Sequence, residues 1–121
     1  MKKFLTLLTI ALSLVLINHS CKPEEPGSIY GLVSSSTTLE MLPNVNVRLY
    51  KLTEASTATY SQLSSTITSS DGSYEFNDLE PGKYMLELYK NNYYESKWNY
   101  LVVEEGRISR MDFTLIPKKY Y

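Results

Sequence analysis

Apolar and polar residues alternate with a period of two over short runs between residues 28 and 116, and turn-forming residues separate the runs. In the runs 45–49 and 84–88, every second residue is Val, Leu or Tyr. Successive side chains of a β-strand point to opposite faces, so each run offers one apolar face to a core. No stretch of this part keeps the i, i+3, i+4, i+7 spacing of an amphipathic helix. The pattern therefore predicts an all-β domain.

The alternation predicts seven strands, at residues 28–33, 44–51, 59–68, 73–77, 83–90, 98–104 and 107–115. Sharp turns are expected at Asp71-Gly72 and Pro81-Gly82, because glycine accepts a positive φ and proline presets φ at the first turn position. Seven short strands with a turn roughly every dozen residues are typical of a two-sheet, Greek-key β-sandwich.

Two runs carry additional information about the sheets. In the last run, Ile108 is out of phase with the alternation of residues 111–115, which predicts a β-bulge near Ser109 or Arg110. Residues 53–70 are dominated by Ser and Thr. A strand with few apolar side chains suits the edge of a sheet, where little of it is buried.

The chain begins with two lysines, an apolar run at residues 4–17 and a short polar stretch at residues 18–20. A charged start, an apolar core and a small residue at the end are typical of a secretory signal peptide. As a helix, 14 residues would cover roughly 21 Å, which is short of the roughly 30 Å hydrocarbon core of a bilayer. We therefore predict that residues 1–20 are a signal peptide rather than a membrane-spanning helix.

Cys21 is the single cysteine of the chain and follows the small residue Ser20. This junction resembles the lipobox of bacterial lipoproteins, which implies that Cys21 becomes the lipidated first residue of the mature protein. Ordinary cleavage would instead leave a free thiol, a liability in an oxidising compartment. A lipid on Cys21 would hold the protein on a membrane without spanning it.

Residues 21–27 then form an extended tether, stiffened by Pro23 and Pro26. Its basic residue followed by Glu24 and Glu25 resembles the export signal that sends some Gram-negative lipoproteins to the outer face of the outer membrane. A solvated linker explains the same residues equally well. The sequence thus predicts a lipid-anchored outer-membrane protein. The anchor would lie in either leaflet of that membrane, and the outer leaflet would expose the protein at the cell surface.

Composition excludes most catalytic chemistry. The chain has 12 basic and 13 acidic residues, a net charge of −1, and one histidine, His19. This balance gives no electrostatic basis for binding nucleic acid. Removing residues 1–20 also removes His19, and no Ser–Lys pair has the spacing of a nucleophile and its base. We expect no catalytic residue, no cofactor and no enzymatic activity.

Four carboxylates lie near one end of the predicted sandwich, at Asp71, Glu75, Asp78 and Glu80. They could collect a calcium ion, but they lack the spacing of a dedicated calcium loop. Acidic residues are also common in turns, where they form local hydrogen bonds. We therefore interpret them as a solvated turn surface and predict no metal site.

The run from Thr68 to Tyr84 resembles the signature of carboxypeptidase regulatory-like domains, with Asp71-Gly72, Tyr74, Phe76, Leu79 and Pro81-Gly82 as its main features. Ile29, Gly31 and Val33 resemble the opening strand of that family, residues 42–47 resemble its second strand, and Asn92 stands where the family often has Gly. The resemblance covers residues 28–116 and implies a transthyretin-like β-sandwich, followed here by a tail at 117–121. In the family, the module accompanies metallopeptidases and outer-membrane receptors as a non-catalytic appendage.

The chain is rich in aromatic residues, with 11 Tyr, 3 Phe and 1 Trp. Tyr93, Tyr94, Trp98 and Tyr100 cluster within eight positions. Rigid aromatics with a polar tip suit surfaces that stack on glycans or dock proteins, although strands also enrich Tyr for packing alone. We predict a non-catalytic, lipid-anchored envelope module that binds a polysaccharide or another envelope protein through this region. The alternative is an accessory subunit acting in trans with an outer-membrane receptor, a transporter or a peptidase.

Overall fold

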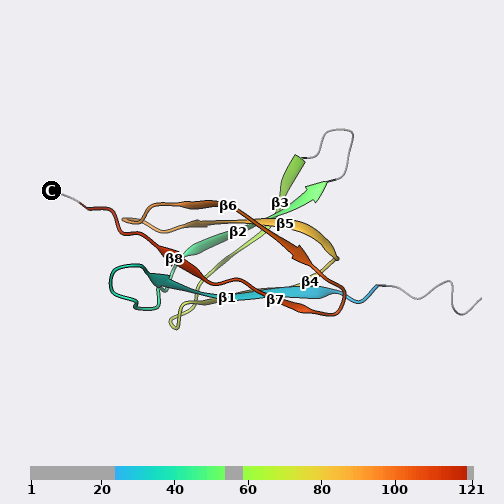
Figure 1. Ribbon diagram of the computed structural model, residues 1–121, viewed down its shortest axis with the longest axis horizontal. Coiled ribbons are helices and arrows are strands. Elements are labelled where there is room, and N and C mark those ends of the chain that lie inside the picture. Colours follow the sequence, from blue (N-terminus) through green and yellow to red (C-terminus); the bar gives the residue numbers. More distant parts are fainter. Residues whose placement is uncertain (1–23, 54–58, 120–121) are drawn as a thin grey trace, which may run out of the picture.

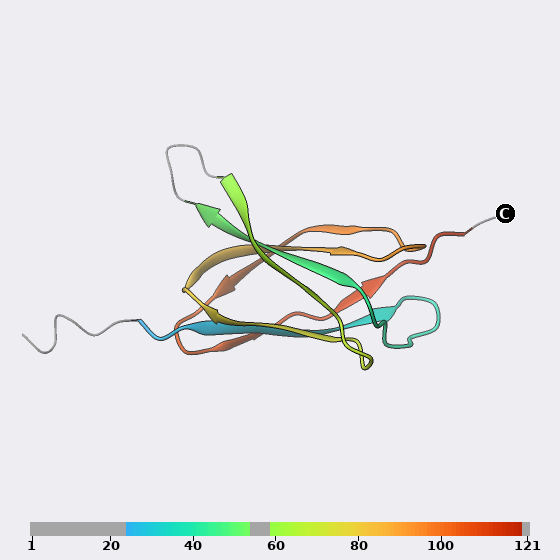
Figure 2. The same ribbon diagram turned by 180° about the vertical axis from the view of Figure 1, so that it is seen from behind.

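The computed structural model describes residues 24–53 and 59–119. These residues form two stacked β-sheets with no α-helix, which Figure 1 shows from one side and Figure 2 from behind. The predicted signal peptide and the lipidation site at Cys21 lie outside the described residues. Within the described ranges, no helix is long and apolar enough to cross a membrane.

The strands are β1 (Gly27–Ser35), β2 (Asn46–Thr53), β3 (Thr59–Ile67), β4 (Ser73–Leu79), β5 (Gly82–Tyr89), β6 (Ser96–Val103), β7 (Ile108–Arg110) and β8 (Phe113–Leu115). One sheet has the order β4-β1-β7, with β8 also paired to β1, and the other has the order β3-β2-β5-β6. All pairs are antiparallel except β1 with β7 and β8, which are parallel. The prediction of an all-β sandwich is confirmed.

The core lies between the two sheets and is filled by alternate residues of the strands. Val47 and Leu49 of β2 pack with Leu86 and Leu88 of β5, and all four are at most 1% exposed. The other sheet contributes further buried side chains, which include Ile29, Val33, Tyr74, Phe76, Leu79 and Leu115. At about 1.5–3 kcal/mol for each large apolar side chain, this burial is the main source of the domain's stability.

The predicted seventh strand is in fact two short strands, β7 and β8, and the predicted bulge is wrong. The register with β1 is the same on both sides of the break, so no residue is inserted. Ile108 is 73% exposed because it lies on the outward face of a regular strand. The ladder is interrupted at Met111 and Asp112 instead. There the Tyr74 hydroxyl donates to the Met111 carbonyl, and the Asp112 carboxylate accepts the Leu32 N–H at 2.9 Å.

The hydroxyl-rich strand β3 lies at a sheet edge, as predicted, and pairs with β2 alone. Figure 1 shows the β2–β3 hairpin projecting away from the rest of its sheet. Seven of the nine residues of β3 are exposed. A single β-bulge interrupts its pairing with β2, at Leu63.

The turns use residues that tolerate a left-handed backbone. Gly72 has a φ of +78° in the β3–β4 turn, and Asn92 has a φ of +70° in the β5–β6 turn. Asn adopts this conformation more readily than most residues, so it can stand where the family often has Gly. Hydrogen bonds from Ser69 and Ser73 lower the pKa of the Asp71 carboxyl to about 2.

Candidate functional site

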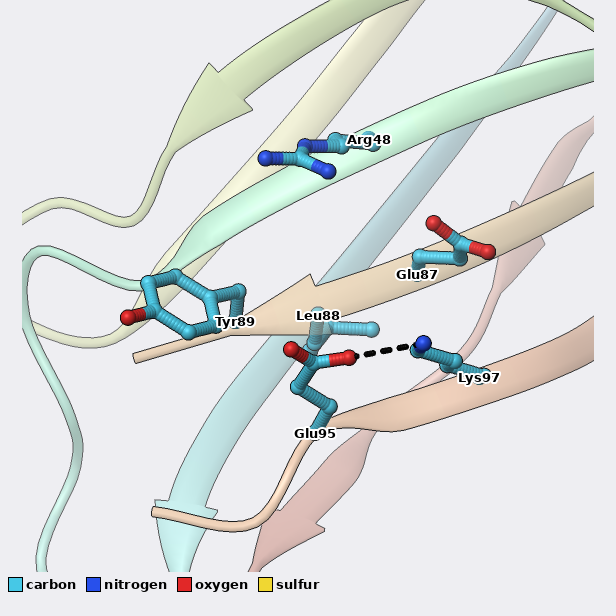
Figure 3. Close-up of a pocket in the computed structure, with 6 residues that line it drawn as sticks. All are labelled: Arg48, Glu87, Leu88, Tyr89, Glu95 and Lys97. Atoms are coloured by element: carbon cyan, nitrogen blue, oxygen red, sulfur yellow. Dashed lines mark ion pairs between the residues drawn. The ribbon is translucent and has the colours of Figure 1, made fainter. Parts of the chain in front are cut away.

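The outward face of the β3-β2-β5-β6 sheet carries a shallow groove of about 210 Å³, shown in Figure 3. We call it the outer groove; its lining residues are Arg48, Glu87, Leu88, Tyr89, Glu95 and Lys97. Pairing places Arg48 of β2 opposite Glu87 of β5. Enclosed small-molecule pockets usually measure roughly 300–1,000 Å³, so this groove suits one unit of a longer ligand.

The charges of the outer groove balance, with two cations and two carboxylates. Lys97 Nζ lies 3.0 Å from Glu95 Oε2, and this hydrogen bond raises the pKa of the lysine. The Tyr50 hydroxyl donates to Glu87 Oε2 at 3.0 Å. Burial, followed by the neighbouring Glu87, raises the pKa of Tyr50. The groove therefore presents donors and acceptors at neutral pH without a net charge.

Aromatic side chains extend the same face beyond the groove. The rings of Tyr60 and Tyr100 are 5.4 Å apart, although they come from β3 and β6, the two edge strands of a four-stranded sheet. They must therefore lean over the two central strands. Met85 lies between Tyr50 and Tyr100 in the register and is only 3% exposed, although its neighbours in β5 place it on the outward face. This part of the face is consequently covered by aromatic rings.

Trp98 lies beside the outer groove in a strained conformation. The register of β5 and β6 shifts between Leu86 and Leu88, so that Lys97 and Trp98 together face Glu87. Trp98 has a φ of +61° and is 63% exposed. A bulky residue at positive φ is a conformational outlier that costs about 1–3 kcal/mol, and such strain gathers at functional sites.

Asn99 holds this bulge in place. Its side-chain amide donates to the Leu86 carbonyl at 3.1 Å and to the Ser96 hydroxyl at 3.0 Å. These two bonds connect both sides of the register shift and offset part of the strain at Trp98. The exposed indole is therefore presented by a supported backbone rather than by a loose loop.

The predicted aromatic cluster at 93–100 does not form a single patch. Tyr93 is half-buried and packs against the core. Tyr94 is 55% exposed, and its backbone N–H donates to the Ile116 carbonyl at 2.8 Å, while Lys118 Nζ lies 5.7 Å from its ring. Trp98 and Tyr100, 53% exposed, belong to β6. Only these last two lie on the strand that borders the outer groove.

The four carboxylates near the turns are dispersed. The Asp71 carboxylate accepts hydrogen bonds from the N–H and the hydroxyl of Ser73 in its own turn. Glu80 forms an ion pair with Lys51. Within the described residues, no three Asp, Glu, His or Cys side chains come close enough to hold a metal ion. Residue 19, the single histidine, lies outside those residues.

The outer groove was not identified from the sequence. Arg48 and Glu87 are separated by 39 positions, and only the β2–β5 register brings them together. One signal was present, because both occupy the outward positions of strongly alternating strands. Predicting the groove would have required the strand order and register in addition to this alternation.

Comparison with known proteins identifies the domain. The family model of the carboxypeptidase regulatory-like domain matches residues 28–116. A search of curated proteins found no match to the sequence.

Three solved structures show similar folds. A pilus adhesin from Streptococcus pneumoniae is 16% identical, with a TM-score of 0.63 over 80% of this chain and 16% of its own. A proposed carbohydrate-binding protein from Bacteroides uniformis is 18% identical, with a TM-score of 0.56 over 77% of this chain and 42% of its own. The 3-chlorocatechol 1,2-dioxygenase of Rhodococcus opacus is 10% identical, with a TM-score of 0.60 over 79% of this chain and 62% of its own.

At these identities, the likenesses show the fold alone. This chain also spans less than half the length of the adhesin and of the Bacteroides protein. The family match carries more weight, because it covers almost the whole of both sheets, from β1 to β8. The chain therefore belongs to the carboxypeptidase regulatory-like domain family.

Proposed function

We propose that the protein is a non-catalytic, lipid-anchored module of the cell envelope that binds a neutral glycan at the outer groove. The observation that carries this proposal is the exposed indole of Trp98, held at positive φ beside the groove. An aromatic ring stacks on the apolar face of a sugar ring, while neighbouring polar groups bond to its hydroxyls.

The electrostatics support a neutral ligand. Arg48 and Lys97 are balanced by Glu87 and Glu95 around the groove, so an anionic ligand would gain little net attraction. Each of these groups can still donate or accept a hydrogen bond at a sugar hydroxyl. The fold likeness to a proposed carbohydrate-binding protein supports the same ligand class.

The position of the groove supports a role in display from a membrane. Gly27 lies next to Val103, at the end of the sandwich where the predicted tether enters. The β5–β6 pair runs from Gly82–Val103 at that end to Leu88–Ser96 beside the groove. Six residue steps along β5 correspond to about 20 Å. A lipid on Cys21 would thus leave the groove near the end of the sandwich farther from the tether.

The test uses residues 22–121, because all eight strands and the core lie between Gly27 and Leu115. Calorimetric titration with soluble starch, xylan and polygalacturonate compares two neutral glycans with an anionic one. We expect binding to a neutral glycan and an affinity loss of about tenfold in Trp98→Ala, equivalent to about 1.4 kcal/mol.

Tyr94→Ala is the matched control, since Tyr94 is a similarly exposed aromatic before β6 with Lys118 Nζ near its ring, whereas Trp98 faces Glu87 of the groove lining. It is expected to bind like the parent protein. Binding only to polygalacturonate, or to none of the three, would reject a neutral glycan ligand. Equal losses in Trp98→Ala and Tyr94→Ala would reject this site.

A further inference from the structure

The free edge of β3 differs from the other sheet edges in carrying no charge. Its nine residues, TYSQLSSTI, include no Lys, Arg, Asp, Glu, Pro or Gly. By contrast, β4 contains Glu75 and Asp78, and β6 contains Lys97 and a bulge. The strands β7 and β8 have only three residues each. Charges, bulges and short length are the usual protections against pairing with another chain, and β3 has only a bulge at Leu63.

The described residues also leave β3 open on its faces. Leu63 is 53% exposed and Ile67 is 62% exposed, and the three residues between them are hydroxyl-bearing. A strand that is polar on both faces specifies its pairing weakly and readily accepts another strand. The segment 63–67 therefore has backbone N–H and C=O groups at a free sheet edge and two exposed apolar side chains, and it contains no charged residue that would repel a partner strand.

We propose that two copies of the protein associate by antiparallel pairing of their β3 strands around a two-fold axis at Ser65. In this register, Ser65 lies opposite Ser65 of the second copy. Leu63 then lies opposite Ile67 of the second copy, and the symmetry repeats the contact. Residues directly opposite one another share a face, so the two exposed apolar side chains of each β3 become neighbours across the interface. A self-complementary contact of this kind closes as a dimer.

The bulge of β3 lies at one end of the segment that this register uses. Between Ser64 and Ile67, the pairing of β3 with β2 is continuous, and Leu63, next to this stretch, is the extra residue of the bulge. The two-fold axis at Ser65 and the contact residue Ile67 therefore lie in the regular part of the strand, and Leu63 borders it.

Charge repulsion does not oppose the dimer either. The nearest charged position in the sheet is Arg48 of β2, which lies opposite Ser65. The two Arg48 backbones would be three strand spacings apart, about 14 Å, which exceeds the Debye length of about 8 Å at physiological salt.

The dimer would join two four-stranded sheets into one of eight strands. Because its two-fold axis is perpendicular to the sheet, both outer grooves would face the same side. If the proposed function holds, a polymeric glycan could occupy two grooves at once, which raises its apparent affinity. This consequence rests on the proposed function, whereas the dimer itself does not.

Sedimentation equilibrium of residues 22–121 over a range of concentrations tests the dimer. We expect a monomer–dimer equilibrium that Ser65→Lys weakens at least tenfold, because like charges directly opposite one another repel. Asn77→Lys adds the same charge to the exposed edge strand β4 and should leave the equilibrium unchanged. Circular dichroism establishes that each variant is folded.

A cross-link tests the register. Residues 22–121 contain no cysteine, so Ser65→Cys introduces a single thiol on the proposed axis. Under mild oxidation it should form an intermolecular disulfide, and Ser61→Cys should not. A protein that stays monomeric at about 1 mM, the weak end of association, would overturn the proposal. A dimer that Ser65→Lys leaves intact, or equal cross-linking of the two cysteine variants, would overturn it as well.

The glycan titration separates this proposal from the proposed function. The monomeric Ser65→Lys variant should keep its affinity for a short oligosaccharide and lose part of its apparent affinity for the polymer. Absence of glycan binding in a protein that still dimerises would reject the proposed function and leave the β3 dimer standing.

Discussion

The Thr68 hydroxyl offers the sharpest test of how the segment before β2 is fixed to the end of β3. Thr68 is 2% exposed. Its oxygen donates to the Leu42 carbonyl at 2.7 Å and accepts the Val45 N–H at 2.9 Å. Thr68→Val keeps the shape and the β-branched Cβ but leaves both backbone groups buried without these partners. Each such group costs about 1–3 kcal/mol. The added methyl recovers about 0.8 kcal/mol, so we expect a net loss of about 1–5 kcal/mol, centred on about 3 kcal/mol.

Thermal unfolding of residues 22–121, followed by circular dichroism, measures this loss. One kcal/mol corresponds to roughly 4–8 °C in a domain of this size, so the central loss of about 3 kcal/mol should lower Tm by about 12 °C or more. Thr66→Val is the control, because Thr66 is half-buried and its hydroxyl makes no hydrogen bond among the described residues. It should change Tm by a few degrees at most. Similar Tm values for the two variants would refute the reasoning.

Three further predictions concern single positions, and a fourth concerns metal removal. Gly31→Ala should destabilise the domain by about 1–3 kcal/mol or more in denaturant titration, because its Cβ would lie 1.8 Å from the Met111 carbonyl oxygen; an unchanged midpoint would contradict the close approach. The low pKa of Asp71, about 2 against about 3.9 when unfolded, stabilises the fold above pH 4, and this contribution disappears as pH falls towards 2. Unfolding of Asp71→Asn should therefore depend less on pH between 4 and 2, and identical profiles would refute this. Cys21→Ala, expressed with its leader in a Gram-negative host, should leave the membrane fraction, whereas retention after leader cleavage would reject the lipid anchor. EDTA should not change Tm, and a large decrease would revive a calcium site.

The sequence predicted the features that depend on neighbouring residues. The alternation in β2 and β5 located their buried faces, and the predominance of Ser and Thr placed β3 at an edge. Gly72 likewise adopts a positive φ within the Asp-Gly turn. These features are local because a period of two and a turn residue act within a few positions.

Features that depend on distant partners were missed. The break between β7 and β8 is set by Tyr74 and by the Asp112–Leu32 bond, which join segments far apart in the chain. The aromatic cluster divides because Tyr93 turns to the core and Trp98 occupies a bulge. The outer groove needs three segments in register, so its charges could not be assembled from the sequence alone.

The fluorescence of Trp98 tests the central claim most directly, because it is the single tryptophan of the chain and lies beside the outer groove. Residues 22–121 are titrated with oligosaccharides from the neutral glycan that binds in calorimetry, and the emission is compared with that of Arg48→Ala and Glu87→Ala. A saturable change that weakens in both variants is predicted. Emission that stays constant while the glycan binds would contradict the placement of the ligand at this groove.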